Sequence, residues 1–127
     1  MRNKLMRTAL LSGLFLFAFE ASAQQFAKGV VYEDINKNGK HDKREKVLSN
    51  VAVSNGREVV QTNNKGEYVL PVGDDNILFV VKPSGYTAPV DKNNLPQFYY
   101  IHNSNGAPDL KFKGVSATGS LPKSVDF

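Results

Sequence analysis

The sequence predicts an all-β fold, a small antiparallel β-sandwich. After the first 23 residues, no window of about eleven residues has apolar side chains at helical spacing. Segments rich in valine and tyrosine instead recur at intervals of about eight to twelve residues, and Asn, Gly and Asp separate them. This alternation of short apolar segments and turn residues is typical of a β-sandwich with one core.

The first strands are predicted in chain order. Residues 26–33, "FAKGVVYE", form the first strand, and a polar loop follows it. Residues 48–63, "LSNVAVSNGREVVQTN", are predicted to form a hairpin that turns at Asn55 and Gly56. Asn-Gly between two apolar runs is a strong local indication of a hairpin, because both residues tolerate a positive φ.

Two more strands follow the hairpin. Residues 67–72, "EYVLPV", place Tyr68, Leu70 and Val72 on one face, which we expect to be buried. Residues 77–81, "ILFVV", do not alternate, so we expect both of their faces to be covered.

The second cover of "ILFVV" is expected from a strand-like segment, residues 97–102 or "QFYYIH". Because side chains alternate between the two faces of a strand, that arrangement would bury one of two pairs, Phe98 with Tyr100 or Tyr99 with Ile101.

The chain is predicted to have three parts: a signal peptide at 1–23, a β-sandwich at 24–87 and an irregular C-terminal extension at 88–127. In the first part, basic residues precede the apolar run Thr8–Phe19, and Ala21–Ala23 supplies small residues before the expected cleavage after Ala23. The alternative, an uncleaved anchor, is disfavoured because the run is short for a bilayer span. A cleaved signal and no cysteine predict a secreted or periplasmic bacterial protein without disulfides.

Removal of the signal leaves 104 residues, enough for one domain. The signal holds three basic residues and one acidic residue, so the totals of 16 and 12 fall to 13 and 11, a net charge of +2. Lysine and arginine are not clustered among stacking aromatic residues, which argues against a nucleic-acid partner.

The extension at 88–127 holds four of the six prolines. We expect it to pack on the sandwich and to lead toward a domain absent from this chain. Its last residues are strand-like, and Leu121, Val125 and Phe127 are expected to form an exposed apolar rim that contacts that domain.

The polar loop matches the spacing D-x-[DN]-x-[DN]-G-x₅-E, with Gly39 at the sharp turn. Its oxygen ligands would converge on one calcium ion, with the backbone carbonyl at the fourth position: Asp34, Asn36, Asn38, Lys40, Asp42 and Glu45. The other interpretation is a surface turn that binds nothing, favoured by the nearby lysines. Any affinity is expected to be weak, on the order of 10⁻⁴–10⁻³ M, and the ion would be structural.

Other residue types point to little chemistry. His41 and His102 have no cysteine or second histidine beside them, so neither indicates a transition-metal site. The aromatic run 98–101 with Tyr86 could form a platform for a glycan, but cover of "ILFVV" is the favoured interpretation.

Several of these features together match known modules. Residues 29–72 resemble the B-type repeats and prealbumin-like modules of bacterial surface proteins. The chain more specifically resembles the N-terminal domain of secreted bacterial calcineurin-like phosphoesterases, where residues 79–106 and 119–127 also fit. The resemblance implies an immunoglobulin-like or prealbumin-like sandwich that precedes a metallophosphoesterase domain of the same parent protein.

The chain itself is not expected to be an enzyme. A two-metal phosphoesterase site needs several His and Asp ligands, and the sequence holds two histidines and none of the motifs D-x-H, G-N-H or G-H-x-H. Two functions follow. One is a non-catalytic accessory domain that positions or stabilises a catalytic domain, and the other is a free-standing adhesion or carbohydrate-binding module of the cell envelope with a structural calcium loop.

Overall fold

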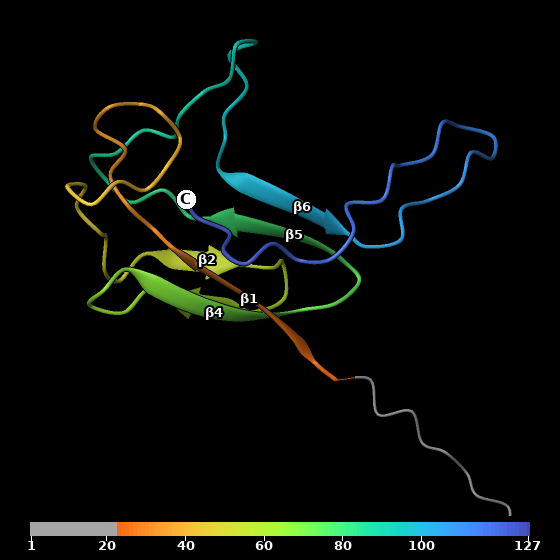
Figure 1. The fold of residues 1–127 in the computed structure, drawn as a ribbon, viewed down its shortest axis with the longest axis horizontal. Coiled ribbons are helices and arrows are strands. Elements are labelled where there is room, and N and C mark those ends of the chain that lie inside the picture. Colours follow the sequence, from red (N-terminus) through yellow and green to blue (C-terminus); the bar gives the residue numbers. More distant parts are fainter. Residues whose placement is uncertain (1–22) are drawn as a thin grey trace, which may run out of the picture.

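A computed structural model describes residues 23–127 (Figure 1). The predicted signal peptide therefore lies outside the described residues, apart from Ala23. The described part contains no helix and has six strands: β1 (Gln25–Val30), β2 (Ala52–Ser54), β3 (Val59–Gln61), β4 (Glu67–Val72), β5 (Asp75–Val80) and β6 (Tyr99–Asn103). Accordingly, no helix in this part of the chain could cross a membrane.

The strands form two antiparallel sheets. One sheet pairs β1 with β4, and the other has the order β3-β2-β5-β6. Leu70 and Val53, one from each sheet, are fully buried in a single core. The prediction of a small all-β sandwich is confirmed.

Strand β4 alternates as its sequence predicted. Tyr68, Leu70 and Val72 are buried, whereas Glu67 and Val69 between and beside them are exposed. This alternation makes β4 one wall of the core.

The predicted hairpin is also present, as β2 paired with β3. Gly56 adopts a φ of +87°, which a residue without Cβ adopts at little cost. Asn55 instead works through its side chain, whose Oδ1 accepts the backbone N–H groups of Arg57 and Glu58 at 2.9 and 2.7 Å. This local bonding supplies partners for the turn's backbone.

The expected cover of "ILFVV" is wrong. Strand β6 pairs with β5 edge to edge in the same sheet, so it lies beside β5 and not over it. Leu78 is fully buried on the inner face, but Ile77 and Val81 on the outer face are about half exposed. Neither expected pair of β6 is buried, since only Tyr100 of the four packs against the core.

His102 takes the buried place on β6 that was expected for an aromatic residue. It lies opposite Asn76 in the register and is fully buried. Its Nδ1 lies 3.5 Å from the Thr118 hydroxyl oxygen, and its Nε2 has no hydrogen-bond partner among the described residues.

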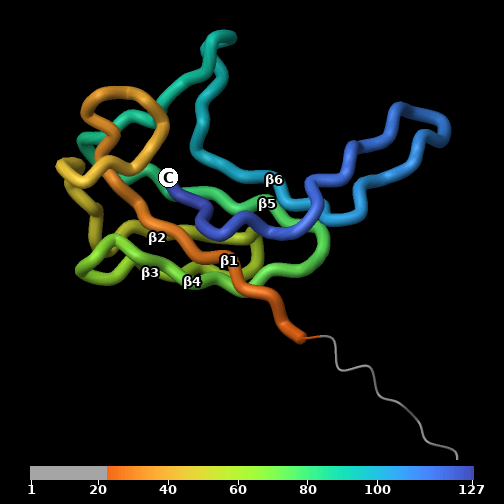
Figure 2. The backbone as a smooth tube through the Cα atoms, in the orientation of Figure 1, coloured from red at the N-terminus to blue at the C-terminus, as the bar shows by residue number. Residues whose placement is uncertain are grey.

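The predicted exposed rim at the end of the chain is also wrong. Val125 is 5% exposed and belongs to the core, and Leu121 and Phe127 pack against the same core. The N–H groups of Val125 and Phe127 donate to carbonyls of β1, at Lys28 and Val30. Figure 2 shows this terminal segment running beside β1. It advances in the same direction as β1 and so adds a third line of chain to that sheet.

Gly29 makes this close approach feasible. A Cβ at position 29 would occupy the space of the Val125 carbonyl oxygen and would crowd the Tyr68 ring. The same carbonyl accepts a 2.6 Å hydrogen bond from the Tyr68 hydroxyl. Burial, with the negative charge of Asp126, raises the pKa of Tyr68, so the hydroxyl stays protonated and able to donate.

Candidate functional site

The polar loop is closed at its base by a short antiparallel ladder. Tyr32 and Val47 form a bridge, and the N–H of Glu33 donates to the Lys46 carbonyl at 2.8 Å. Val31 and Leu48 on either side are buried in the core. The loop is thus anchored by strand-like pairing, whereas an EF-hand loop is anchored by two helices.

Inside the loop, side-chain oxygens bond the backbone of the first half. The Asp34 carboxylate accepts the N–H groups of Asn38 and Gly39 at 3.1 and 2.8 Å. Asn36 Oδ1 accepts the N–H of Asn38, and Asn38 Oδ1 accepts the N–H of Lys40. Gly39 has a φ of +70°, which lets the backbone turn back at this point.

The second half closes through Asp42 and Glu45. The Asp42 carboxylate accepts the amide groups of Asn36 and Asn38 at 2.7 and 2.8 Å. These hydrogen bonds, that of Asn36 first, lower the pKa of Asp42 below its ordinary value. Glu45 is 9% exposed, and its two oxygens accept the N–H groups of Ile35 and Asp42 at 3.1 and 2.9 Å.

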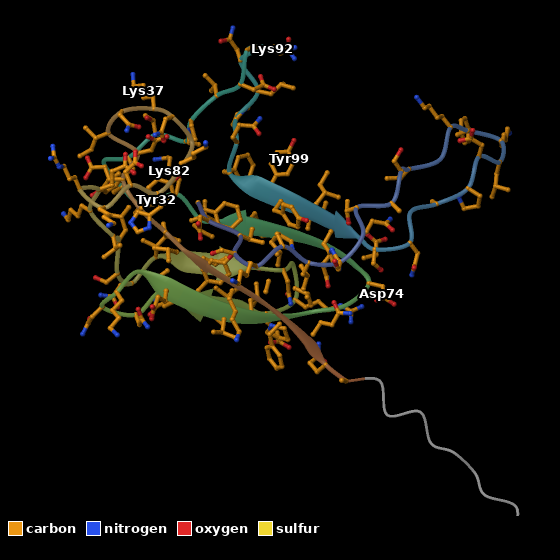
Figure 3. All side chains as sticks on the ribbon, viewed as in Figure 1. Tyr32, Lys37, Asp74, Lys82, Lys92 and Tyr99 are labelled. Atoms are coloured by element: carbon orange, nitrogen blue, oxygen red, sulfur yellow. The ribbon has the colours of Figure 1, made fainter. Side chains whose placement is uncertain are left out.

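All five side chains that were predicted as ligands therefore meet in one hydrogen-bonded network. They are the oxygen-bearing residues Asp34, Asn36, Asn38, Asp42 and Glu45. The sixth residue, Lys40, joins through its N–H. Figure 3 shows Lys37 at the tip of the loop, on the far side from Tyr32 at the base.

Tyr32 is a residue of this site that the sequence pattern did not indicate. Burial raises its pKa to about 12, and the negative charges of Asp34, Glu45, Asp126 and Asp42 add to the effect. Its ring lies 5.0 Å from that of His41. Apolar Val31 and Leu48 just outside the loop were the available signal that strand pairing continues past its ends.

The structure also limits which ligands a metal ion could have. Among residues 23–127, no group of three or more His, Cys, Asp or Glu side chains could hold a metal ion. Any cation in the loop would therefore rely on asparagine and backbone oxygens together with the carboxylates.

The aromatic residues of the alternative glycan platform do not all lie on one exposed surface. Tyr86 and Tyr100 pack against the core, whereas the ring of Phe98 stands edge-on to that of Tyr99.

Six short strands in two sheets, with one polar loop closed by a ladder, define the chain as a small β-sandwich module. A family model described as "N terminal of Calcineurin-like phosphoesterase" matches residues 35–116. Because this match covers more than half of the chain, the chain belongs to that family. No curated protein and no solved structure matches it.

Family membership implies a catalytic domain in the same parent protein, which suggests that the parent is a hydrolase. The match begins inside the polar loop and ends before the terminal segment. The two lines of chain outside it, β1 and residues 121–127, are bonded to each other. The folded unit is therefore larger than the matched segment on both sides.

Proposed function

We propose that this chain is the non-catalytic N-terminal accessory domain of an exported calcineurin-like metallophosphoesterase, and that it positions or stabilises the catalytic domain. The family match over residues 35–116 carries this proposal. The burial of Val125 supports it, because a linker that leaves an anchored segment samples fewer orientations than one that leaves a loose tail.

The absence of phosphoesterase motifs leads to the first prediction. The chain from Gln24 onward, which holds every described strand, is expected to show no hydrolysis of phosphomonoesters or phosphodiesters above blank with Mn²⁺, Zn²⁺ or Mg²⁺. The parent protein without residues 24–127 is expected to keep its metal but to lose activity and melt at a lower temperature. Metal-dependent turnover by the purified chain, or an unchanged parent after the deletion, would contradict the proposal.

We also infer that residues 34–45 hold one structural calcium ion in the exported protein. The support is the hydrogen-bonded network that gathers five oxygen-bearing side chains in one loop, together with the buried Glu45 and the negative charge around Tyr32. Calcium prefers such hard oxygen ligands, and the lysine at the loop tip points away from them.

Calcium at 5 mM is therefore expected to raise the melting temperature relative to EGTA. When the calcium concentration is ten times the dissociation constant, binding adds about 1.4 kcal/mol to the free energy of unfolding. That raises the melting temperature by roughly 4–8 °C for a domain of this size. Asp34→Ala and Glu45→Ala are each expected to abolish the rise. Asp91→Ala is a matched control, because the Asp91 carboxylate also accepts two backbone N–H groups but lies in another loop. Equal melting in EGTA and calcium would show that the loop is only a turn.

A further inference from the structure

The outward side of β5 and β6 carries a set of apolar side chains that none of the other strands in residues 23–127 covers. In the register of the two strands, Ile77 lies opposite Ile101 and Phe79 lies opposite Tyr99. Val81 follows on the same side, directly after β5. We call these five residues the outer β5–β6 face. Ile77, Tyr99 and Ile101 are 51%, 41% and 46% exposed.

Four of the large hydrophobic residues that are exposed in the described part of the chain lie on this face, namely Ile77, Val81, Tyr99 and Ile101. Most of the others lie in the two segments before and after β6, which project beyond the sheets. The exceptions are Phe26, Ile35, Val59 and Val69. A contiguous apolar surface on a soluble domain indicates an interaction site, whereas scattered exposed residues need no explanation.

The free edge of β6 lies at the same place. The N–H of Val80 donates to the Phe98 carbonyl, so the backbone groups of alternate residues in β6 face β5. Those of Tyr99 and Ile101 therefore point away from β5, and no described backbone group pairs with them. Farther along, Asn103 is bonded to Thr118 and is not free. Open edges of this kind are sites where another strand can pair.

Two long segments extend from the ends of β6. Residues 82–98 precede the strand and residues 104–118 follow it, and both project beyond the sheets (Figures 1 and 2). Each segment contains one isolated antiparallel bridge. It joins Val90 to Pro96 in the first segment and Ala107 to Val115 in the second. Figure 3 shows Tyr99 projecting from β6 on the side away from the β1–β4 sheet.

We propose that the outer β5–β6 face and the free edge at Tyr99 and Ile101 are the surface on which the catalytic domain of the same parent protein docks. This inference rests on the proposed function. The family places a catalytic domain in the parent, and a tethered partner reaches a high effective concentration, on the order of millimolar. A small apolar face with two free backbone positions is then sufficient for association.

A second copy of this chain fits the surface less well. Segments 82–98 and 104–118 leave the two ends of β6 and extend beyond the sheets (Figure 1), so edge-to-edge pairing of two β6 strands would bring the projecting segments of both copies to the same place. A different partner with a protruding strand or loop reaches β6 directly and can bond to it along its edge.

The test compares hydrogen exchange in the chain from Gln24 onward with exchange in the full parent protein. The amides of Tyr99 and Ile101 are expected to exchange at least tenfold more slowly in the parent. The amide of Val59, on the outer edge strand β3, is expected to exchange at the same rate in both. Equal rates at Tyr99 and Ile101 in the two proteins would overturn the proposal.

A pair of matched variants provides a second measurement. Ile101→Glu and Val69→Glu replace β-branched residues that are 46% and 51% exposed on the outsides of the two sheets. Both are expected to change the melting temperature of the separate chain equally. In the parent, only Ile101→Glu is expected to speed proteolysis between the domains severalfold. Equal proteolysis of the two variants would exclude this surface.

The outcomes separate this proposal from the proposed function. If deletion of the domain weakens the parent but Ile101→Glu behaves as Val69→Glu, the accessory role stands and the docking surface is wrong. If the deletion has no effect, the accessory role itself fails, and with it this inference. A chain that sediments as a dimer, and reverts to a monomer with Ile101→Glu, would assign the surface to self-association instead.

Discussion

Gly29→Ala is expected to destabilise the chain by about 3 kcal/mol, because the new Cβ competes with the backbone of Val125 for the same space. The terminal segment must then move away from β1. It would give up the burial of Val125 and the hydrogen bond from Tyr68, which are part of that cost. The melting temperature, measured by circular dichroism, is expected to fall by roughly 12–24 °C.

Gly73→Ala is the control for this prediction. Gly73 does not have a positive φ, and a Cβ there would meet only the Asn76 side chain, at the ordinary contact distance of 3.6 Å. This variant is expected to unfold within about 0.5 kcal/mol of the original chain. If the two glycine variants lost equal stability, the terminal segment would not be packed against β1 as described.

Leu78→Ala is expected to cost about 2–5 kcal/mol, since Leu78 is fully buried between the two sheets and its removal leaves a cavity. Its neighbour provides the control. Ile77 lies on the same strand but faces outward and is 51% exposed, so Ile77→Ala is expected to cost about 1 kcal/mol or less. Urea unfolding of the two variants gives both values. A reversed order would mean that the faces of β5 are assigned the wrong way round.

The sequence was most informative where structure is set by nearby residues. The alternation in β4 and the Asn55–Gly56 turn are local patterns, and both predictions were confirmed. The run "ILFVV" was not decided locally. Its apolar residues fit a strand covered on both faces as well as one whose outer face is open, and only the placement of β6 beside β5 distinguishes these arrangements.

The burial of Val125 could not be derived from sequence for a different reason. Its contact with β1 joins two segments at opposite ends of the folded unit, and no sequence pattern in either segment predicts that they pair. Gly29 was visible, but a glycine in a strand indicates only that something approaches closely. Polar His102 was likewise an improbable candidate for a fully buried position on β6.

The candidate loop lies between these cases. The spacing of its oxygen-bearing residues predicted that they converge, and the hydrogen bonds among Asp34, Asn38 and Asp42 bring them together. The burial of Glu45 and the position of Tyr32 depend on the ladder that closes the loop. That ladder is a tertiary feature, although Val31 and Leu48 at its ends were visible in the sequence. Whether the loop holds calcium stays a prediction.

The pairing of β1 with the end of the chain also affects the order in which the protein can assemble. Val30 bonds to Asp126 across a separation of 96 residues, so a chain synthesised from its N-terminus carries β1 long before this partner exists. Strand β4 can cover one edge of β1 earlier, while the other edge stays open to water or to a chaperone. Such distant contacts slow folding because the entropy of closing the intervening chain is lost before they form. That edge of β1 would then stay open to wrong pairing until residues 121–127 have been made and bond to it.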